Sequence, residues 1–303
     1  MQKFELVCQE LGVPIAEDKT VLSSPVLVFL GLEIDSVKRI KIPIDKLQAL
    51  ASLLHGVRVK KKVTLKKLQS LAGSLNFCVR AIPSARAFIR RFYNAMSGVK
   101  KSHHFIRVTH GMTEDIQVLL MFFELYNGYC SFPERFWVDN SQLELYTDSA
   151  GGDGSKGGGA YFHGKWAFIS WPKQWIASDV IRDITFLELV PIVMSTFIWG
   201  AELQNKKILL HTDNQSLVTI LNNKTSRSCR IMGLVHPLVL RCMLHNIQFR
   251  ALHIPGNTNS IVDAISRKQW DRFRSLAPHA ARLPEVIPAA FKQLISSMKL
   301  REF

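Results

Sequence analysis

The chain is organised around the stretch Leu143-Glu144-Leu145-Tyr146-Thr147-Asp148-Ser149-Ala150, which Gly151-Gly152 follows directly. Its alternation of apolar and polar residues predicts a half-buried strand. The strand presents one carboxylate, Asp148, at its end, where a rigid backbone can hold a metal ion within reach of a phosphate. A strand that ends in Asp and Gly is also a common turn. The acids that follow along the chain decide between these two interpretations.

Three further acids occupy comparable places in the second half of the chain. Asp213 follows an apolar strand, Glu188 lies in the first turn of an apolar helix, and Asp263 lies in a short helix near the end of the same half. An acid on an apolar helical face is unfavourable unless it is paired or binds a metal. A second interpretation of Glu188 is as the capping-box acid of a helix that begins at Thr185.

Carboxylate oxygens select the metal that such a site would hold. Four oxygen ligands suit Mg²⁺ or Mn²⁺, whereas zinc would favour His or Cys. Two such ions about 4 Å apart can activate a water on one side of a phosphodiester and stabilise the departing oxygen on the other. The sequence therefore predicts hydrolysis by two ions, with Asp148 bridging them, Glu188 and Asp213 on one side and Asp263 on the other.

The composition points to a polyanionic partner. The 303 residues suffice for about two domains, and the formal net charge is +15, with a pI near 9.8. The charge is clustered, because residues 46–113 contain no acid. A basic solvated surface is the simpler alternative, but clustered positive charge favours nucleic acid.

We assign phosphate contact to basic residues of the first half, to the glycine loop after Asp148, and to two asparagines near the other acids. Phe88 and Phe92, which are interleaved with arginines, are assigned to core packing instead. Recognition of RNA would use the 2′-hydroxyl in a minor groove. The predicted nucleic-acid-binding residues are Lys60, Lys61, Lys62, Lys66, Lys67, Arg86, Arg90, Arg91, Gly151, Gly152, Asn214 and Asn259.

Cysteine usage and hydropathy predict an intracellular protein, in the nucleus or the cytoplasm, with no membrane partner. The five cysteines show no Cys-x-x-Cys spacing and are odd in number, which is typical of reduced thiols. No signal peptide is expected at the start. The longest apolar run, residues 186–201, contains Glu188 and Pro191 and is too short to span a bilayer.

Periodicity predicts two halves of different architecture. The first half should contain a helix, a small β-hairpin and then basic helices, with Thr64 and Thr113 as N-caps. The second half reads as three strands, a helix, a strand, two helices, a strand and a helix, which is typical of a mixed sheet covered by helices. In the first half we expect a helix over 1–12, a β-rich run over 26–35 paired with 39–42, and helices from 43, from 64, over 84–96 and over 113–126. In the second half we expect strands over 143–147, 159–162, 166–169, 206–212 and 247–253, and helices over 185–199, 215–222, 229–245 and 259–267.

Residues 143–267 resemble a ribonuclease H domain of the retroelement type. The resembling residues are Tyr146-Thr147-Asp148, Phe186-Leu187-Glu188-Leu189, His211-Thr212-Asp213-Asn214, and His253-Ile254-Pro255-Gly256-Asn257 with Asn259 and Asp263-Ala264-Ile265-Ser266-Arg267. The resemblance implies a five-stranded mixed sheet flanked by helices. It also implies that Asp148, Glu188, Asp213 and Asp263 are catalytic metal-binding carboxylates of an endonuclease that cuts RNA in RNA–DNA hybrids.

Upstream, the chain resembles the stretch just after the catalytic palm of a reverse transcriptase, through Leu11-Gly12-Val13-Pro14-Ile15-Ala16, Lys19-Thr20 and Phe29-Leu30-Gly31-Leu32-Glu33-Ile34-Asp35. The whole is most similar to DIRS-like retroelements, whose polyproteins continue into a tyrosine recombinase. The implied division is an end-of-palm remnant with a β-hairpin over 1–42, a basic helical thumb/connection-like region over 43–127, a linker over 128–142, a ribonuclease H-like domain over 143–270 and a tail over 271–303.

The chain departs from these families in three places. It lacks a Tyr-x-Asp-Asp motif, so we expect no polymerase activity and regard a palm-bearing reverse transcriptase chain as a candidate partner. The tail from Leu276 to Phe303 is expected to stop before a recombinase could form. Many cellular ribonucleases H carry a catalytic His in the loop before the last helix, but 256–258 contain none, and we interpret His253 as structural.

Three hypotheses follow. The first is a Mg²⁺-dependent ribonuclease H-type endonuclease that is a fragment of a retroelement polyprotein. The second is a catalytically weak or inactive nucleic-acid-binding module, in which the acids persist without metal geometry. The third is a structural remnant whose helical half contacts protein. Only the first two predict a steep salt dependence of nucleic-acid binding.

Overall fold

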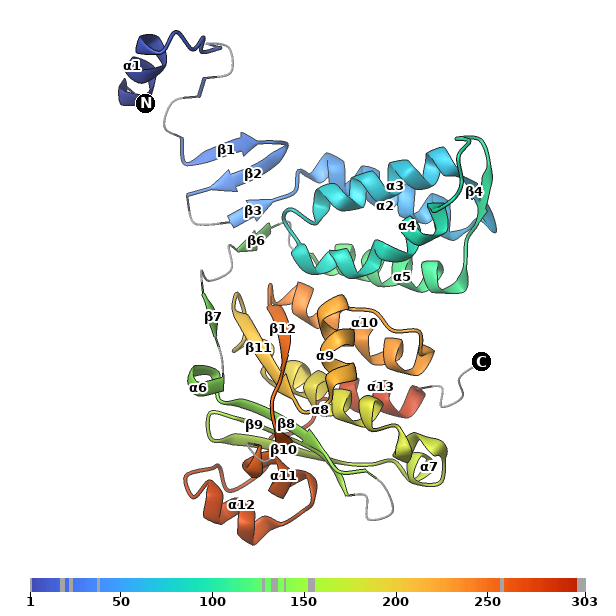
Figure 1. Ribbon diagram of the computed structural model, residues 1–303, viewed down its shortest axis with the longest axis vertical. Coiled ribbons are helices and arrows are strands. Elements are labelled where there is room, and N and C mark those ends of the chain that lie inside the picture. Colours follow the sequence, from blue (N-terminus) through green and yellow to red (C-terminus); the bar gives the residue numbers. More distant parts are fainter. Residues whose placement is uncertain are drawn as a thin grey trace.

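The computed structural model describes residues 2–16, 20–21, 24–36, 39–126, 129–131, 136–138, 140–151, 156–256 and 259–298. They form a mixed α/β protein in which a small sheet and a group of helices precede a second group of strands and helices (Figure 1). One hydrophobic core runs through both groups, because Leu54 and Phe92 of the first belong to the same buried cluster as Leu189 and Leu238 of the second.

The first sheet is antiparallel, in the order β1-β2-β3-β6, and follows helix α1 (Gln2–Glu10). The predicted hairpin between 32–35 and 39–42 is confirmed. The predicted β-rich run over 26–35 forms two paired strands rather than one, because Leu30 and Gly31 have φ angles of 48° and 79° and turn the chain back on itself. Two consecutive residues in the left-handed region are typical of a two-residue hairpin turn. The strands are β1 (Val26–Phe29), β2 (Leu32–Asp35), β3 (Arg39–Lys41) and β6 (Tyr129–Ser131).

The helical part of the first half confirms some predicted boundaries and corrects others. The side chain of Thr64 accepts a hydrogen bond from the Lys67 amide and caps α3, as predicted. The cap of α5 is Thr109 rather than Thr113. The helix predicted over 84–96 is a 3₁₀ helix, η2, followed by a separate α4. The elements are α2 (Ile44–Arg58), β4 (Lys62–Thr64), α3 (Leu65–Cys78), η2 (Pro83–Phe88), α4 (Arg90–Met96), β5 (Phe105–Arg107) and α5 (His110–Leu125).

The strands of the second half pair as two three-stranded sheets. One is antiparallel, in the order β10-β9-β8, and the other is parallel, in the order β12-β11-β7. Strands β8 and β11 lie next to each other but share no ladder. The strands are β7 (Trp137–Val138), β8 (Leu145–Ser149), β9 (Gly157–Phe162), β10 (Lys165–Ser170), β11 (Lys207–Thr212) and β12 (Gln248–His253).

The predicted single five-stranded sheet is therefore corrected, within the described residues, to two sheets that meet at β8 and β11. The short strand β7 pairs with Lys207 and Ile208, on the edge of β11 opposite β12. Strand β7 thereby occupies backbone groups of Lys207 and Ile208 with which β8 would have to pair if the five strands formed one sheet.

Helices cover both faces of these strands. The apolar helix α8 contacts β8, β9 and α10, while α11 contacts β8 and β9. Helix α8 has 16 residues, and no helix in the described ranges has both the length and the apolarity to cross a bilayer. All five cysteines are free thiols, and only Cys229 is exposed. The helices are α6 (Asn140–Leu143), α7 (Lys173–Ile176), η3 (Asp179–Arg182), α8 (Ile184–Trp199), α9 (Gln215–Asn223), α10 (Cys229–Leu244), α11 (Ser260–Ser266), α12 (Trp270–Leu276) and α13 (Ala289–Ser297).

A buried polar contact joins the two halves where α10 packs on α5. Asp115, which is only 1% exposed, accepts a hydrogen bond of 2.9 Å from Nη1 of Arg91. Nε2 of His236 lies 2.9 Å from the same carboxylate oxygen. Arg91 also donates to the carbonyl of Gly111 at 2.8 Å. Nη1 of Arg91 is thus used within the protein, while the side chain is 27% exposed, and its assignment to phosphate contact stays a prediction.

Candidate functional site

Asp148 occupies the end of β8, and the neighbouring strand β9 determines what can approach it. In the ladder Asp148 lies opposite Gly159. A Cβ atom at position 159 would stand 2.8 Å from Cγ2 of Ile265, so only glycine leaves room for α11 to pack this closely. The close packing lets the Ser266 hydroxyl donate a hydrogen bond of 2.6 Å to Oδ2 of Asp148. The glycine-rich strand thus positions the helix that bears Ser266 and Asp263.

Replacing Gly159 with Ala should lower the free energy of unfolding by about 1–3 kcal/mol, because the added methyl overpacks the contact with α11. Gly73→Ala is the matched control. Position 73 lies in α3 with nothing within 4 Å of the added Cβ, so that change should stabilise the protein by about 0.5–1 kcal/mol. Urea unfolding of both variants measures the difference. Equal stabilities of the two variants would contradict the steric role of Gly159.

Glu188 projects from α8 toward the same strand end. It is 6% exposed, and its Oε1 accepts a hydrogen bond of 2.9 Å from the hydroxyl of Ser149. The cap of α8 is Asp183, whose side chain accepts from the Phe186 amide at 3.0 Å. The capping-box interpretation of Glu188 with Thr185 is therefore wrong. Glu188 is buried beside β8 without a role in the helix terminus.

Asp213 and Asp263 complete the set of acids in different environments. Asp213 follows β11 directly and is exposed. Its Oδ2 would lie 2.8 Å from a Cβ atom at position 256, so Gly256 provides the space for this carboxylate. Asp263 is paired, since it accepts from Nε of Arg267 at 2.6 Å and from Nη1 of Arg272 at 2.7 Å.

The acids influence one another electrostatically. Burial, together with the charges of Asp263 and Asp213, raises the pKa of Asp148 to about 6 against the opposing hydrogen bond from Ser266. Burial and then the charge of Asp148 raise the pKa of Glu188 to about 8. Burial also disfavours the ionised form of Asp263, but hydrogen bonds from Arg267 and Arg272 outweigh it and lower its pKa. Asp148, Glu188 and Asp213 therefore form a group of acids in which, within the described residues, no ion pair stabilises the ionised form.

The carboxylates of Asp148, Glu188 and Asp213 are candidate ligands for a divalent cation. Three carboxylates from three different elements supply the hard oxygen ligands that Mg²⁺ and Mn²⁺ prefer. Burial, and to a lesser extent the charges of neighbouring acids, raises the pKa values of Asp148 and Glu188, and a bound cation would stabilise their ionised forms. In the described part of the chain, however, no three His, Cys, Asp or Glu side chains are gathered closely enough to chelate one ion. The chemistry of the donors fits such a cation, and the carboxylates would have to draw together around it.

The residues predicted to bind nucleic acid are distributed over several places. Gly151 packs against α8, since a Cβ atom there would stand 2.7 Å from Cδ1 of Leu187, and Gly152 lies outside the described residues. Of the predicted basic residues other than Arg91, all except the half-buried Lys67 are exposed, and they cluster around the start of α3 or along η2 and α4: Lys60, Lys61, Lys62, Lys66, Lys67, Arg86 and Arg90.

The two asparagines make hydrogen bonds within the protein, and their assignment to nucleic acid stays a prediction. Asn214 caps α9 by accepting from the Leu217 amide at 3.0 Å, and its Nδ2 donates to the Thr185 hydroxyl at 3.1 Å. Nδ2 of Asn259 donates to the carbonyl of Thr147 at 2.8 Å and so ties the start of α11 to β8. Both asparagines position acids: Asn214 follows Asp213 directly, and Asn259 holds the helix of Asp263.

The structural interpretation of His253 agrees with its position. It is the last residue of β12, and its Nε2 lies 3.1 Å from the backbone carbonyl of Asp213. Asn257 and Thr258, in the loop before α11, lie outside the described residues. The imidazole ring of His253 therefore contacts the backbone of Asp213, one of the four acids.

Two pairs of residues contact the acids or line a hollow without having been predicted from the sequence. Ser266 and Arg272 contact Asp148 and Asp263, respectively. Lys224 and Arg250 line a hollow between the two halves. The position of Lys224 just after a predicted helix offered a local indication, but nothing in the sequence places it opposite Arg86.

Comparisons with known proteins were made on the whole chain. No protein-family model matches it, and no curated protein matches it either. Among solved structures it is similar to the foamy viral protease-reverse transcriptase in complex with RNA/DNA hybrid, with 14% identity and a TM-score of 0.32. The match covers 84% of this chain and 33% of that one, so the chain spans about a third of the viral protein's length. A likeness at this TM-score does not establish a common fold, and the DIRS-like resemblance stays a prediction.

Proposed function

We propose that this protein is a metal-dependent endonuclease of the ribonuclease H type that hydrolyses the RNA strand of RNA–DNA hybrids. One observation carries the proposal. Asp148 from β8 and Glu188 from α8 are carboxyl groups whose pKa values are raised first by burial and then by the charges of neighbouring acids, among them Asp213 at the junction of β11 and α9, and none of the three forms an ion pair with a described cation. Strongly perturbed acids that lie together are typical of functional sites.

Asp148, Glu188 and Asp213 are the residues that would hold Mg²⁺ or Mn²⁺. Asp263 would join them on release from Arg267 and Arg272, so that two ions could be bound. A divalent cation at this place supplies a Lewis acid that activates water and stabilises negative charge on phosphate. The hydroxyls of Ser149 and Ser266 orient the carboxylates of Glu188 and Asp148.

The proposed activity also requires residues that bind the phosphate backbone of the substrate. Exposed Lys60, Lys61, Lys62 and Lys66 are well placed to contact phosphates, which confers affinity without sequence specificity. Discrimination of RNA from DNA would come from the 2′-hydroxyl. Since the chain contains no Tyr-x-Asp-Asp motif, a palm-bearing reverse transcriptase chain is the partner that would supply polymerase activity.

A second candidate is a nucleic-acid-binding module with weak or no catalysis. The observation in its favour is that both oxygens of Asp263 are bound to arginines, and that no three-residue metal cluster is preformed among the described residues. In this case the exposed basic residues would bind nucleic acid, but the acids would not catalyse its hydrolysis.

Cleavage of an RNA–DNA hybrid labelled on the RNA strand distinguishes the two. The proposed enzyme should cut the RNA in the presence of Mg²⁺ or Mn²⁺, lose activity with a chelator, and leave the DNA strand and a matched DNA duplex intact. Binding of the hybrid that weakens steeply with salt, without any cutting at either metal, would favour the binding module. Absence of both would contradict the two candidates together.

A further inference from the structure

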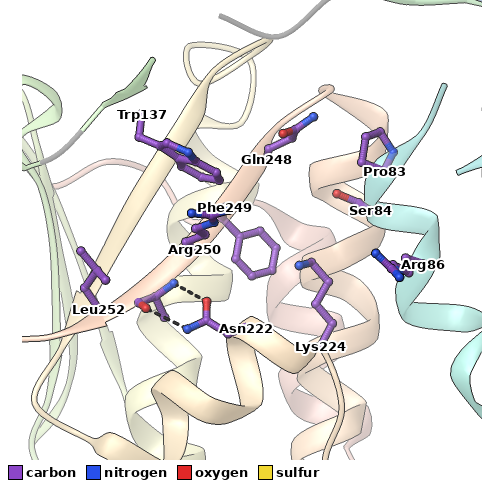
Figure 2. A pocket seen from close by; sticks show the side chains of 11 residues that line it. Pro83, Ser84, Arg86, Trp137, Asn222, Lys224, Gln248, Phe249, Arg250 and Leu252 are labelled. Atoms are coloured by element: carbon purple, nitrogen blue, oxygen red, sulfur yellow. Dashed lines mark hydrogen bonds between the residues drawn. The ribbon is translucent and has the colours of Figure 1, made fainter. Parts of the chain in front are cut away.

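A hollow of about 500 Å³ opens between the two halves of the molecule. Figure 2 shows Arg86 of η2 on one wall, facing Lys224 after α9 and Arg250 on β12. A second hollow of about 530 Å³ adds Arg90 and Tyr93. The two hollows share four residues, so they form one continuous groove, here called the basic groove: Pro83, Arg86, Asn222 and Lys224.

The charge of the basic groove is all of one sign. Its charged residues are Arg86, Arg90, Lys224 and Arg250, and no carboxylate is among the described residues that line it. Aromatic rings rather than acids hold two of these cations. Nζ of Lys224 lies 4.7 Å from the ring centre of Phe249, and the guanidinium carbon of Arg250 lies 4.6 Å from that of Trp137.

Cations held in this way retain their full attraction for an external anion. A cation–π contact orients a positive group without neutralising its charge. Burial, reinforced by the charge of Arg250, lowers the pKa of Lys224, so the ammonium is destabilised until an anion approaches. Asn222 gives the groove a rigid floor, because its side-chain amide donates to the carbonyl of Ala251 and accepts from the Ala251 amide, each at 2.9 Å.

Two elements connect the groove to the acids. Helix α9 begins at Gln215, two residues after Asp213, and ends at Asn223, beside Lys224. Its nine residues span about 14 Å at 1.5 Å per residue. On β12, Leu252 lines the groove, while the next residue, His253, contacts the backbone carbonyl of Asp213.

This separation determines the kind of anion. A single phosphate or mononucleotide is too small to reach from Lys224 to Asp213 along the length of α9, which is about 14 Å for its nine residues. A strand with regularly spaced phosphates can do so.

We propose that the basic groove binds the phosphate backbone of the nucleic-acid strand that is cut at Asp148, Glu188 and Asp213, at a point several nucleotides from the cut. This inference rests on the proposed function for the identity of the strand. Both walls of the groove contribute cations, so the helical half and the acid-bearing half bind the same strand. No group in the groove needs to contact base edges, and binding there is independent of sequence.

The test measures the salt dependence of binding to a labelled RNA–DNA hybrid by the full chain and three variants. Lys224→Gln and Arg86→Gln each remove one cation, from opposite walls. Each should reduce the slope of log affinity against log salt by about 0.7–0.9, the contribution of one phosphate contact. Lys292→Gln is the matched control, because Lys292 is exposed on α13 and lines neither hollow.

Inorganic phosphate and a mononucleotide serve as competitors in the same assay. Displacement of the hybrid only by a second long hybrid agrees with the proposal, whereas displacement by micromolar mononucleotide would show an isolated nucleotide pocket and overturn it. If both groove variants behave like Lys292→Gln, the groove does not bind the strand, even if RNA is still cut. If their slopes fall but the wild type never cuts, the groove stands and the proposed function fails. Thermal unfolding of Arg86→Gln shows whether this variant keeps its fold. Because Arg86 is exposed, its replacement should change the melting temperature little.

Discussion

Asp148→Asn should reduce metal-dependent cleavage of RNA in a hybrid at least about a thousandfold, which corresponds to about 4 kcal/mol of transition-state stabilisation. Asp148 is the central acid, because it interacts electrostatically with Glu188, Asp213 and Asp263. Asparagine keeps the shape of the side chain and one carbonyl oxygen to accept from Ser266, but removes the charge that a cation needs. Single-turnover cleavage at saturating protein measures the loss.

Asp45→Asn is the control for this substitution. Asp45 is an exposed acid in the first turn of α2, in the helical half. The same change of charge there should leave the cleavage rate within about twofold, because exposed charges away from a site contribute little. An Asp148→Asn protein that still cuts at the wild-type rate would remove Asp148 from the site and contradict the proposed function.

Glu188→Gln should raise the free energy of unfolding in metal-free buffer by about 2–3 kcal/mol at pH 7, while abolishing cleavage. The folded protein raises the pKa of Glu188 from 4.5 to about 8. The native state thus holds a proton that the unfolded chain releases, and stability falls as pH rises from about 4.5 to about 8. Glutamine does not ionise, so the variant avoids this loss of stability. Its side-chain oxygen can still accept a hydrogen bond from the Ser149 hydroxyl.

The pH profile and the metal dependence of stability check this explanation. The advantage of Glu188→Gln should vanish near pH 4 and be complete above pH 8, as followed by urea unfolding. Mn²⁺ should stabilise the wild type and not the variant, since a ligand that binds only the folded state raises its stability. Glu124→Gln, at an exposed position of α5, should change stability by less than about 0.5 kcal/mol. A Glu188→Gln protein less stable than wild type at pH 7 would contradict the raised pKa of Glu188 in the folded protein.

Opposite effects of one substitution on stability and on activity are expected for a site that holds like charges. In the absence of a cation, Glu188 and Asp148 destabilise the fold by their burial and proximity. A protein retains such a group where it has a function. The predictions for Asp148→Asn and Glu188→Gln together therefore test whether the acids catalyse metal-dependent cleavage or have no catalytic function.

Periodicity along the chain was sufficient to predict most individual elements. The alternation over 145–149, the apolar run of α8 and the cap at Thr64 depend on residues within one or two turns of each other, so local sequence determines them. The same local patterns located Asp148, Glu188, Asp213 and Asp263 at the ends of strands or on helices. The buried position of Glu188 followed from the apolar residues on either side of it.

Only the tertiary structure decided which residues meet across the chain. Pairing of β7 with β11, the engagement of Arg91 by Asp115, and the bond from Asn259 to Thr147 join residues far apart in sequence, and hydrogen-bonding capacity alone does not name a partner. The basic groove likewise exists because α10 packs on α5 and η2, which brings Arg86 opposite Lys224. The sequence by itself determined the local elements and the acids they bear, because periodicity and capping act over a few residues. Packing between distant segments decided which charges are neutralised and which remain available to bind a strand.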